Sequence, residues 1–384
     1  MKRAGIFCLV VCLVLGCVPI CAGAVDLELP AKGAVLMDAA TGTVLYEQNS
    51  HDPLPLASVT KIMTMLLIME AIDDGRIGYE DTVTASETAA EKGGSQIYLK
   101  AGETMTVRDL LKSVAVSSAN DAACALAEHI AGSEAAFVDM MNTRAKELGM
   151  ENTHFVNCTG LDDDETAKEH RSSAYDIALM SRQLLTGHPG IKEFTTIWMD
   201  TVRDGTFGLA NTNKLVRFYQ GATGLKTGYT SQAGFCLSAS AVREGMELIA
   251  VVLGCDTSAE RFSACKSMLD HGFAGYTLID PKLENVPQVA VKLGTTDAVN
   301  AVPAQNSALL IDKSQKNTVN IQITIDAPEV TAPVSKGQRL GTLTVRSGEQ
   351  VLAQVPLVAE HGVERLSWSD LFVKVMKKIT MAKD

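Results

Sequence analysis

The order in which strand and helix patterns follow one another limits the possible folds more than any other feature of this sequence. A hairpin pattern over about 34–47 comes first, and apolar residues then recur every three to four positions over 58–73 and through most of 106–185. Three strand-like runs follow Gly224, and a helix is expected from about 258 to 270. Strands on both sides of a helical region predict an α+β fold in which both chain ends contribute to one sheet.

The residue pattern changes from helical to strand-like beyond Tyr276. Short β-branched runs alternate with Gly, Pro and Asp turns from about 280 to 360, which predicts a small all-β domain. This region contains no cluster of residues typical of catalysis. We therefore expect it to act as a spacer or to bind a partner.

The last twenty residues predict an amphipathic helix. One face would carry Trp368, Leu371, Phe372, Val375, Met376 and Ile379, and the other Asp370, Lys374, Lys377 and Lys378. Such a helix is too charged to span a bilayer, but it can lie in the interface with its lysines near anionic headgroups. The alternative is a helix that packs on its own β domain.

The first 24 residues have the pattern of a secretory signal peptide. Lys2 and Arg3 precede an apolar run that ends in small residues, with cleavage expected after Ala24. Removing 1–24 takes away these two basic residues and no acidic ones, so the formal net charge changes from −11 to −13. A nucleic-acid partner is not predicted, because a phosphate-binding surface should be basic.

The cysteine and histidine patterns predict neither a disulfide framework nor a metal site. Four of the nine cysteines lie in the predicted signal, which leaves Cys124, Cys158, Cys236, Cys255 and Cys265. These are odd in number, widely spaced and without a C-x-x-C pair, so we expect small buried residues. No two histidines are four apart, and no cofactor or metal is predicted.

A serine and a lysine, Ser58 and Lys61, stand three residues apart at the start of the apolar run over 58–73. Residues at this spacing share one face of a helix, so the lysine can reach the serine hydroxyl. The S-x-x-K pattern alone says little, because serine is a common helix cap and a second copy occurs at Ser263 and Lys266.

Two further motifs indicate that the S-x-x-K pattern at Ser58 and Lys61 is catalytic. Ser118 and Asn120 form an S-x-N pattern before a predicted helix, and "KTG" begins at Lys226 on a predicted strand. Each has a simple structural reading, as a helix cap or an exposed strand residue. In the order S-x-x-K, S-x-N, K-T-G, however, they are the signature of serine β-lactamases and penicillin-binding proteins. The Ser263 copy fails this test because it follows the K-T-G.

The chain resembles the low-molecular-mass penicillin-binding proteins, specifically the serine-type D-alanyl-D-alanine carboxypeptidases. The segments "DAATGTVLYEQN", "LASVTKIMT", "SSANDAA", "AYDIALMSRQL" and "GLKTGYT" carry the resemblance. It implies a penicillin-binding/β-lactamase-like transpeptidase domain over 25–278, an antiparallel sheet flanked by helices. An all-β domain over 279–360 and a membrane-associating helix over 361–384 would follow. The protein would act at the outer face of the cytoplasmic membrane, in the cell wall.

The resemblance also implies a reaction and its residues. Ser58 would attack the D-Ala–D-Ala carbonyl of a peptidoglycan stem peptide and form an acyl-enzyme. Lys61 would act as a neutral base, its pKa lowered by burial and by the second cation, Lys226. Ser118 would bridge the lysines and Ser58 and relay the proton, and Asn120 would orient Lys61 and the substrate peptide group.

The substrate would bind along the strand that carries K-T-G. Lys226 and the Thr227 hydroxyl would attract its carboxylate, and Gly228 would leave room for the peptide to add as an extra strand. The backbone N–H groups of Ser58 and Tyr229 would form the oxyanion hole.

The sequence departs from some relatives at two positions of this site. Tyr229 stands where some carry histidine, so only its backbone N–H carries over. Thr212 lies near the place of an arginine that holds the substrate carboxylate. Arg261 is then a further candidate for that role, or an ordinary arginine on a helix surface.

Three other functions are compatible with parts of the pattern. A class A β-lactamase needs a glutamate that activates water, but the E-x-x-L-N stretch is absent and Glu165 and Glu169 lie in an acidic loop. β-Lactams should therefore acylate Ser58 and leave slowly. Endopeptidase action on cross-links uses the same chemistry, and a non-catalytic wall-binding protein would not need the complete motifs.

Overall fold

The computed structural model describes residues 27–162, 165–279, 286–304 and 308–380. The predicted signal peptide, 1–24, lies outside the described residues. The side chains at 165, 374, 375 and 377–380 are likewise not described.

A five-stranded antiparallel sheet organises the first part of the chain, in the order β2–β1–β9–β8–β7. Strands β1 (Gly33–Asp38) and β2 (Val44–Gln48) come from the N-terminal side. Strands β7 (Ala222–Thr230), β8 (Gly234–Arg243) and β9 (Met246–Cys255) come from the C-terminal side. The prediction of one sheet built from both chain ends is confirmed.

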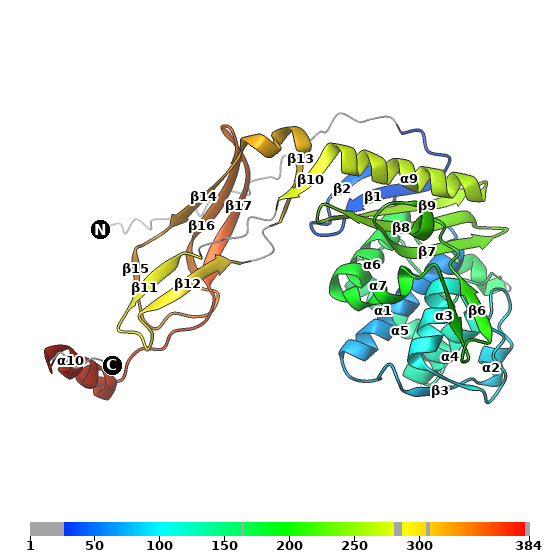
Figure 1. Ribbon diagram of the computed structural model, residues 1–384, viewed down its shortest axis with the longest axis horizontal. Helices are drawn as coiled ribbons and strands as arrows, with labels where there is room; N and C mark the ends of the chain where they lie inside the picture. The colour runs from blue at the N-terminus through cyan, green and yellow to red at the C-terminus, as the bar shows by residue number, and fades with distance from the viewer. Residues whose placement is uncertain (1–26, 163–164, 280–285, 305–307, 381–384) are drawn as a thin grey trace, which may run out of the picture.

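Helices cover both faces of this sheet (Figure 1). The long helix α9 (Ser258–Gly275) packs on one face, and α6 (Ala174–Gly187) lies against the other with the helical lobe. Because strand residues alternate between faces, β9 contributes to two cores. Leu248, Ala250 and Val252 pack with the α9 side chains, whereas Ile249, Val251 and Leu253 belong to the core of the helical lobe.

The helical lobe is built around α1 (Lys61–Asp73), whose side chains are buried almost all round. A helix that is apolar on every side belongs in the centre of a domain. Around it lie α3 (Val107–Ser117), α4 (Asn120–Ala131) and α5 (Glu134–Glu147), so the predicted helical region is confirmed.

The sequence did not reveal several short elements of the lobe. Strands β3 (Thr82–Thr84) and β4 (Thr104–Thr106) pair, as do β5 (Met199–Val202) and β6 (Phe207–Ala210). Helices α2 (Glu87–Ala90), α7 (Lys192–Thr195) and α8 (Leu215–Phe218) and the 3₁₀ turns η2 (Glu165–Glu169) and η3 (Pro189–Ile191) are also short. Runs of three to five residues are too short for a periodic pattern to emerge.

The C-terminal strands form a separate body, as the all-β prediction expected (Figure 1). Strand β10 (Tyr276–Ile279) pairs with β13 (Leu309–Asp312), and η4 (Lys313–Thr318) follows. A six-stranded sheet has the order β14–β16–β17–β12–β11–β15 and surrounds an apolar core of its own. Its strands are β11 (Gln288–Lys292), β12 (Ala298–Pro303), β14 (Val319–Ile325), β15 (Glu329–Thr331), β16 (Arg339–Ser347) and β17 (Gln350–Ala359).

The last described element is α10 (Trp368–Thr380), at the end of the β body away from the five-stranded sheet (Figure 1). Trp368 and Phe372 are 88% and 67% exposed, so these side chains do not pack on the β strands. The predicted positions of Lys374, Val375, Lys377, Lys378 and Ile379 on the two faces fall outside the described side chains. Among the described residues, no helix is both long and apolar enough to cross a membrane.

Candidate active site

The predicted nucleophile lies in a 3₁₀ turn, η1 (Ala57–Thr60), directly before α1. Thr60 is the residue at the start of α1, and its side chain makes no capping hydrogen bond there. The reading of Ser58 as a cap of this helix is therefore wrong. Instead, the Ser58 hydroxyl oxygen accepts a hydrogen bond from Lys61 Nζ at 2.9 Å.

Lys61 is completely buried, and its ammonium is held at two points. Besides Ser58, Nζ donates to the carbonyl oxygen of Thr159 at 2.8 Å. Burial lowers the pKa of Lys61 to about 7, while Cys158 and Asp121 act in the opposite direction. The expected contribution of Lys226 is not among these causes, so desolvation alone accounts for the lowered pKa of Lys61.

The repulsion between the two lysines acts instead on Lys226. This side chain is also buried, and the pKa of Lys226 is lowered well below its usual range by burial first, then by Lys61 and Arg261. Lys226 Nζ donates to the carbonyl of Thr227 at 2.9 Å.

The S-x-N residues lie in the turn between α3 and α4. Ser118 is buried and has a left-handed backbone, with φ 63°, and Asn120 is the first residue of α4. Asn120 Nδ2 donates to the carbonyl of Gly93 at 2.7 Å, whereas its buried Oδ1 has no partner among the described residues. The expected hydrogen bonds from Ser118 to Ser58 or the lysines, and from Asn120 to Lys61, are not formed in the described part of the chain.

Gly228 allows strand β7 to approach the turn that carries Ser58. A Cβ at this position would lie 2.7 Å from the carbonyl oxygen of Leu56 and 3.1 Å from the backbone nitrogen of Val59. The glycine is thus required by the protein's own packing, a reason that the sequence did not show. β7 is the last strand of its sheet, so the edge away from β8 is the one on which a peptide would add.

Two further residues surround the K-T-G strand. The Thr227 hydroxyl donates to the Thr212 hydroxyl at 2.6 Å, so the threonine near the expected arginine position does contact the motif. Tyr229 is 57% exposed and stacks on Phe235, with ring centroids 4.3 Å apart.

Arg261 is not the ordinary surface arginine that one reading of the sequence expected. It is only 8% exposed, and its Nη1 donates to the carbonyl of Gly228 at 2.9 Å. Its Nε has no partner among the described residues. Arg261 therefore links α9 to the strand that carries K-T-G.

Sequence reasoning missed a buried network that supports the nucleophile turn. The Thr60 hydroxyl donates to the carbonyl of Ala57 and lies 2.7 Å from His170 Nε2, while His170 Nδ1 accepts from the backbone N–H of Val156. Burial, followed by nearby positive charge, lowers the pKa of His170 to about 3, so the ring is neutral and Nε2 donates to Thr60. Ala57 is held at φ 48°, a conformation that needs such support in a non-glycine residue.

The loop that holds Lys61 was missed as well. Asn157 Oδ1 accepts from the backbone N–H groups of Thr159 and Gly160, which forms a tight turn and presents the Thr159 carbonyl to Lys61. Gly160 has φ +81°, and a Cβ there would lie 1.9 Å from the carbonyl oxygen of Ala57. The run "NCTG" is a turn signal in the sequence, but nothing in it indicates a catalytic neighbour.

No contact with Ser58 or Lys61 is observed for the other candidates whose side chains are described. Ser263 and Lys266, the second S-x-x-K copy, are exposed on α9. Glu169, in η2, is exposed, and the side chain of Glu165 is outside the described residues.

Two protein-family models match parts of the chain. Residues 21–257 match the peptidase S11 family, D-alanyl-D-alanine carboxypeptidase, and residues 281–365 match the C-terminal domain of penicillin-binding protein 5. The chain is 43% identical to the D-alanyl-D-alanine carboxypeptidase DacF of Bacillus subtilis, over 93% of this chain and 92% of the relative.

Solved structures are similar to the chain as well. Penicillin-binding protein 5 from Haemophilus influenzae is 30% identical with a TM-score of 0.76, covering 89% of this chain and all of that one. Penicillin-binding protein D2 from Listeria monocytogenes, in its ampicillin-bound form, is 35% identical with a TM-score of 0.59. The match covers 65% of this chain and 99% of that one.

A D-alanyl-D-alanine endopeptidase from Pseudomonas aeruginosa matches a smaller part, 34% identical over 55% of this chain and 66% of the relative. The carboxypeptidase DacF, by contrast, is matched over nearly its whole length. The chain belongs to the D-alanyl-D-alanine carboxypeptidase family, peptidase S11, of the penicillin-binding enzymes.

Proposed function

We propose that the protein removes the terminal D-alanine of peptidoglycan stem peptides through an acyl-enzyme on Ser58. The observation that carries this proposal is the contact between Ser58 and a fully buried lysine whose pKa is lowered to about 7. A serine hydroxyl becomes nucleophilic only beside a base, and a lysine is a base only when neutral.

The reaction has two steps. Ser58 Oγ bonds to the carbonyl carbon of the penultimate D-alanine while Lys61 Nζ accepts the hydroxyl proton. That proton then passes to the amine of the leaving D-alanine as the C–N bond breaks, and Ser118, which is buried, would relay it. Water then cleaves the ester and frees the trimmed peptide and the serine.

Strand β7 and α4 offer the substrate its contacts. The peptide would add along the edge of β7, with Lys226 and Thr227 near its carboxylate, and a bound carboxylate would favour the charged form of Lys226. The unpartnered Oδ1 of Asn120 is an acceptor for a substrate N–H, which would explain why a buried polar atom lacks a partner. The N–H groups of Ser58 and Tyr229 would hold the oxyanion.

Cross-link cleavage is the second candidate, because a bridged D-alanyl bond differs from the carboxypeptidase substrate only in its leaving amine. The endopeptidase relative covers little more than half of this chain, so we rank this activity below D-alanine release. A β-lactamase or a non-catalytic wall-binding protein is supported less, given the complete motifs and the family.

The acylation rate should depend on pH through Lys61. The base acts in its neutral form, and a pKa of about 7 means that this form is lost as the pH falls below neutrality. The second-order constant for acylation by benzylpenicillin should therefore fall about tenfold per pH unit below 7 and level off above it. A profile with its midpoint near the ordinary lysine pKa would contradict this assignment.

Benzylpenicillin should trap the enzyme at Ser58. We expect one penicilloyl group per chain by intact mass, mapped to the peptide containing Ser58, with slow release because the described site offers no dedicated glutamate. Ser58→Ala should not be labelled, whereas Ser263→Ala, which alters the exposed S-x-x-K copy, should be labelled normally. Rapid, repeated hydrolysis of nitrocefin would overturn the trap, and labelling of Ser58→Ala would overturn the nucleophile.

We extend the proposal to the organisation of the protein in the cell. An export signal over 1–24 would be removed, the peptidase over 25–278 and the β domain over 279–360 would reach the cell wall, and 361–384 would bind the outer face of the cytoplasmic membrane. The exposure of Trp368, Phe372 and Met376 on α10 supports this last point.

Binding to vesicles tests the membrane helix. The purified protein should sediment with vesicles containing phosphatidylglycerol, and the double change Trp368→Ser and Phe372→Ser should abolish this while leaving D-alanine release unchanged. Met199→Ser, at an exposed apolar residue of β5, is the matched control. Equal sedimentation of all three proteins would show that α10 does not bind the membrane.

A further inference from the structure

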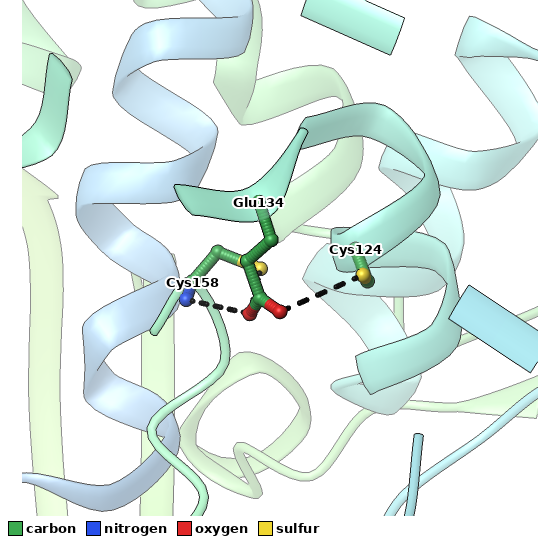
Figure 2. Close-up of side chains that lie close together, drawn as sticks. All are labelled: Cys124, Glu134 and Cys158. Atoms are coloured by element: carbon green, nitrogen blue, oxygen red, sulfur yellow. Dashed lines mark hydrogen bonds between the residues drawn. The ribbon is translucent and has the colours of Figure 1, made fainter. Parts of the chain in front are cut away.

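Two cysteines and a glutamate meet beside the active site (Figure 2). Cys124 lies on α4, and Glu134 is the first residue of α5. Cys158 lies in the loop that follows α5, directly before Thr159. The Cys158 sulfur is 3.2 Å from Glu134 Oε1, and the Cys124 sulfur is 4.0 Å from Oε2. One sulfur or oxygen atom from each residue lies within 4.8 Å of the others.

These separations suit a tetrahedral ion. Zn–S bonds of about 2.3 Å and Zn–O bonds of about 2.0–2.2 Å place neighbouring ligand atoms about 3.5–3.8 Å apart. The two observed S···O distances, which involve different oxygens of Glu134, lie on either side of that range. Thiolates select thiophilic ions over Mg²⁺ or Ca²⁺.

The surroundings suit the charge of such an ion. Both cysteines are fully buried, and Lys92 Nζ lies 2.5 Å from Glu134 Oε2. Two thiolates, one carboxylate, one divalent cation and the lysine sum to zero net charge, which a buried cluster requires. Lys92 would orient the carboxylate from outside, as groups that hydrogen-bond to metal ligands commonly do.

A cavity reaches one member of the cluster, Glu134. A cavity of about 260 Å³ is lined by Lys92, Gly93, Glu134, Asn157 and Thr159, among others. Neither cysteine lines this cavity, which is large enough to hold a water molecule on the Glu134 side of the cluster. We propose that Cys124, Glu134 and Cys158 form a binding site for a thiophilic divalent cation, Zn²⁺ in the first instance, with water completing the tetrahedron.

The ion would tie together two segments of the catalytic site. Cys124 lies one turn after Asn120 on α4, and Cys158 precedes Thr159, whose carbonyl holds Lys61. The carbonyl of Cys158 itself accepts from the Thr64 hydroxyl of α1 at 2.6 Å. Cation binding therefore stabilises the arrangement of the loop, α1 and α4 without touching the substrate.

Cobalt provides a direct test on the purified protein after thiol reduction and removal of metal. Titration with Co²⁺ should produce a thiolate-to-cobalt charge-transfer band in the near ultraviolet that saturates at one ion per chain, and Zn²⁺ should displace it. Cys124→Ser and Cys158→Ser should each weaken binding more than about 100-fold, because changes that act only through a metal ligand already cost about 10–100-fold. Cys265→Ser, a buried thiol on α9, should bind normally.

A second readout covers variants that fold poorly. Zn²⁺ at saturating concentration should raise the melting temperature of the wild type and of Cys265→Ser, but not of Cys124→Ser or Cys158→Ser. The proposal is overturned if the wild type shows no charge-transfer band. It is also overturned if the wild type binds Co²⁺ no more tightly than the two cluster variants, or if Cys124 and Cys158 are recovered as a disulfide that binds no metal.

Discussion

Replacing Lys61 with methionine is expected to slow acylation of Ser58 by about 10²–10⁴-fold, the usual contribution of a general base. Methionine keeps most of the side-chain volume. It also removes a fully buried amine, which is costly to bury, so the fold should persist. The loss should therefore appear in kcat/KM for D-alanine release and in the rate of penicillin labelling, with an unchanged circular dichroism spectrum.

Lys266→Met is the matched control for this change. Lys266 occupies the same place in the second S-x-x-K copy but is exposed on α9, so its replacement should leave the rate within about twofold of the wild type, as for most surface changes. A Lys61→Met enzyme that retained more than a tenth of the wild-type acylation rate would show that another group takes the Ser58 proton.

Gly160→Ala should be the most damaging single change among the glycines around the site. The added Cβ would overlap the carbonyl of Ala57 at 1.9 Å, at a residue whose φ is +81°. We expect a loss of about 2–5 kcal/mol in the free energy of unfolding, from the left-handed backbone and the forced packing together. Because Ala57 precedes the nucleophile, the part of the protein that still folds should also acylate slowly.

Gly149→Ala separates the two causes. Gly149 also has a left-handed backbone, φ +73°, but nothing lies within 4 Å of a Cβ there. The Gly149→Ala variant should lose only about 1–2 kcal/mol in the free energy of unfolding and keep the wild-type acylation rate. Denaturant unfolding followed by tryptophan fluorescence measures both variants, and equal losses would show that contact with Ala57 is unimportant.

The sequence predicted those features that local pattern determines. The change of period from 2 to 3.6 and back predicted the sheet–helix–sheet order, and the spacing of Ser58 and Lys61 predicted that the two side chains meet. The three motifs carried enough information to indicate the family.

Features that depend on contacts between distant residues could not be predicted. His170 supports Thr60 across 110 positions, and Thr159 holds Lys61 across 98, without any shared motif. The lowered pKa of Lys61 is caused by burial, with no contribution from Lys226 among its causes, and the extent of burial is a property of the packed fold. Cys124 and Cys158 likewise lie too far apart in the chain for spacing rules to connect them.

The same limit applies to Gly228. A strand glycine is consistent with an approaching ligand or with an approaching segment of the same protein, and the sequence cannot distinguish these. The structure identifies the segment as the turn from Leu56 to Val59. Likewise, Arg261 has the sequence context of a helix-surface residue, and only the position of α9 against β7 and β8 shows that it is buried.

D-Alanine release from a diacyl-Lys-D-Ala-D-Ala tripeptide tests the central claim most directly, with residues 25–384 compared with the same protein carrying Ser58→Ala. We expect release by the first protein and none by the second, while both show the same melting temperature. If neither protein releases D-alanine although penicillin still labels Ser58, carboxypeptidase action is contradicted and cross-link cleavage takes its place. If Ser58→Ala releases D-alanine at the wild-type rate, the acyl-enzyme on Ser58 is contradicted.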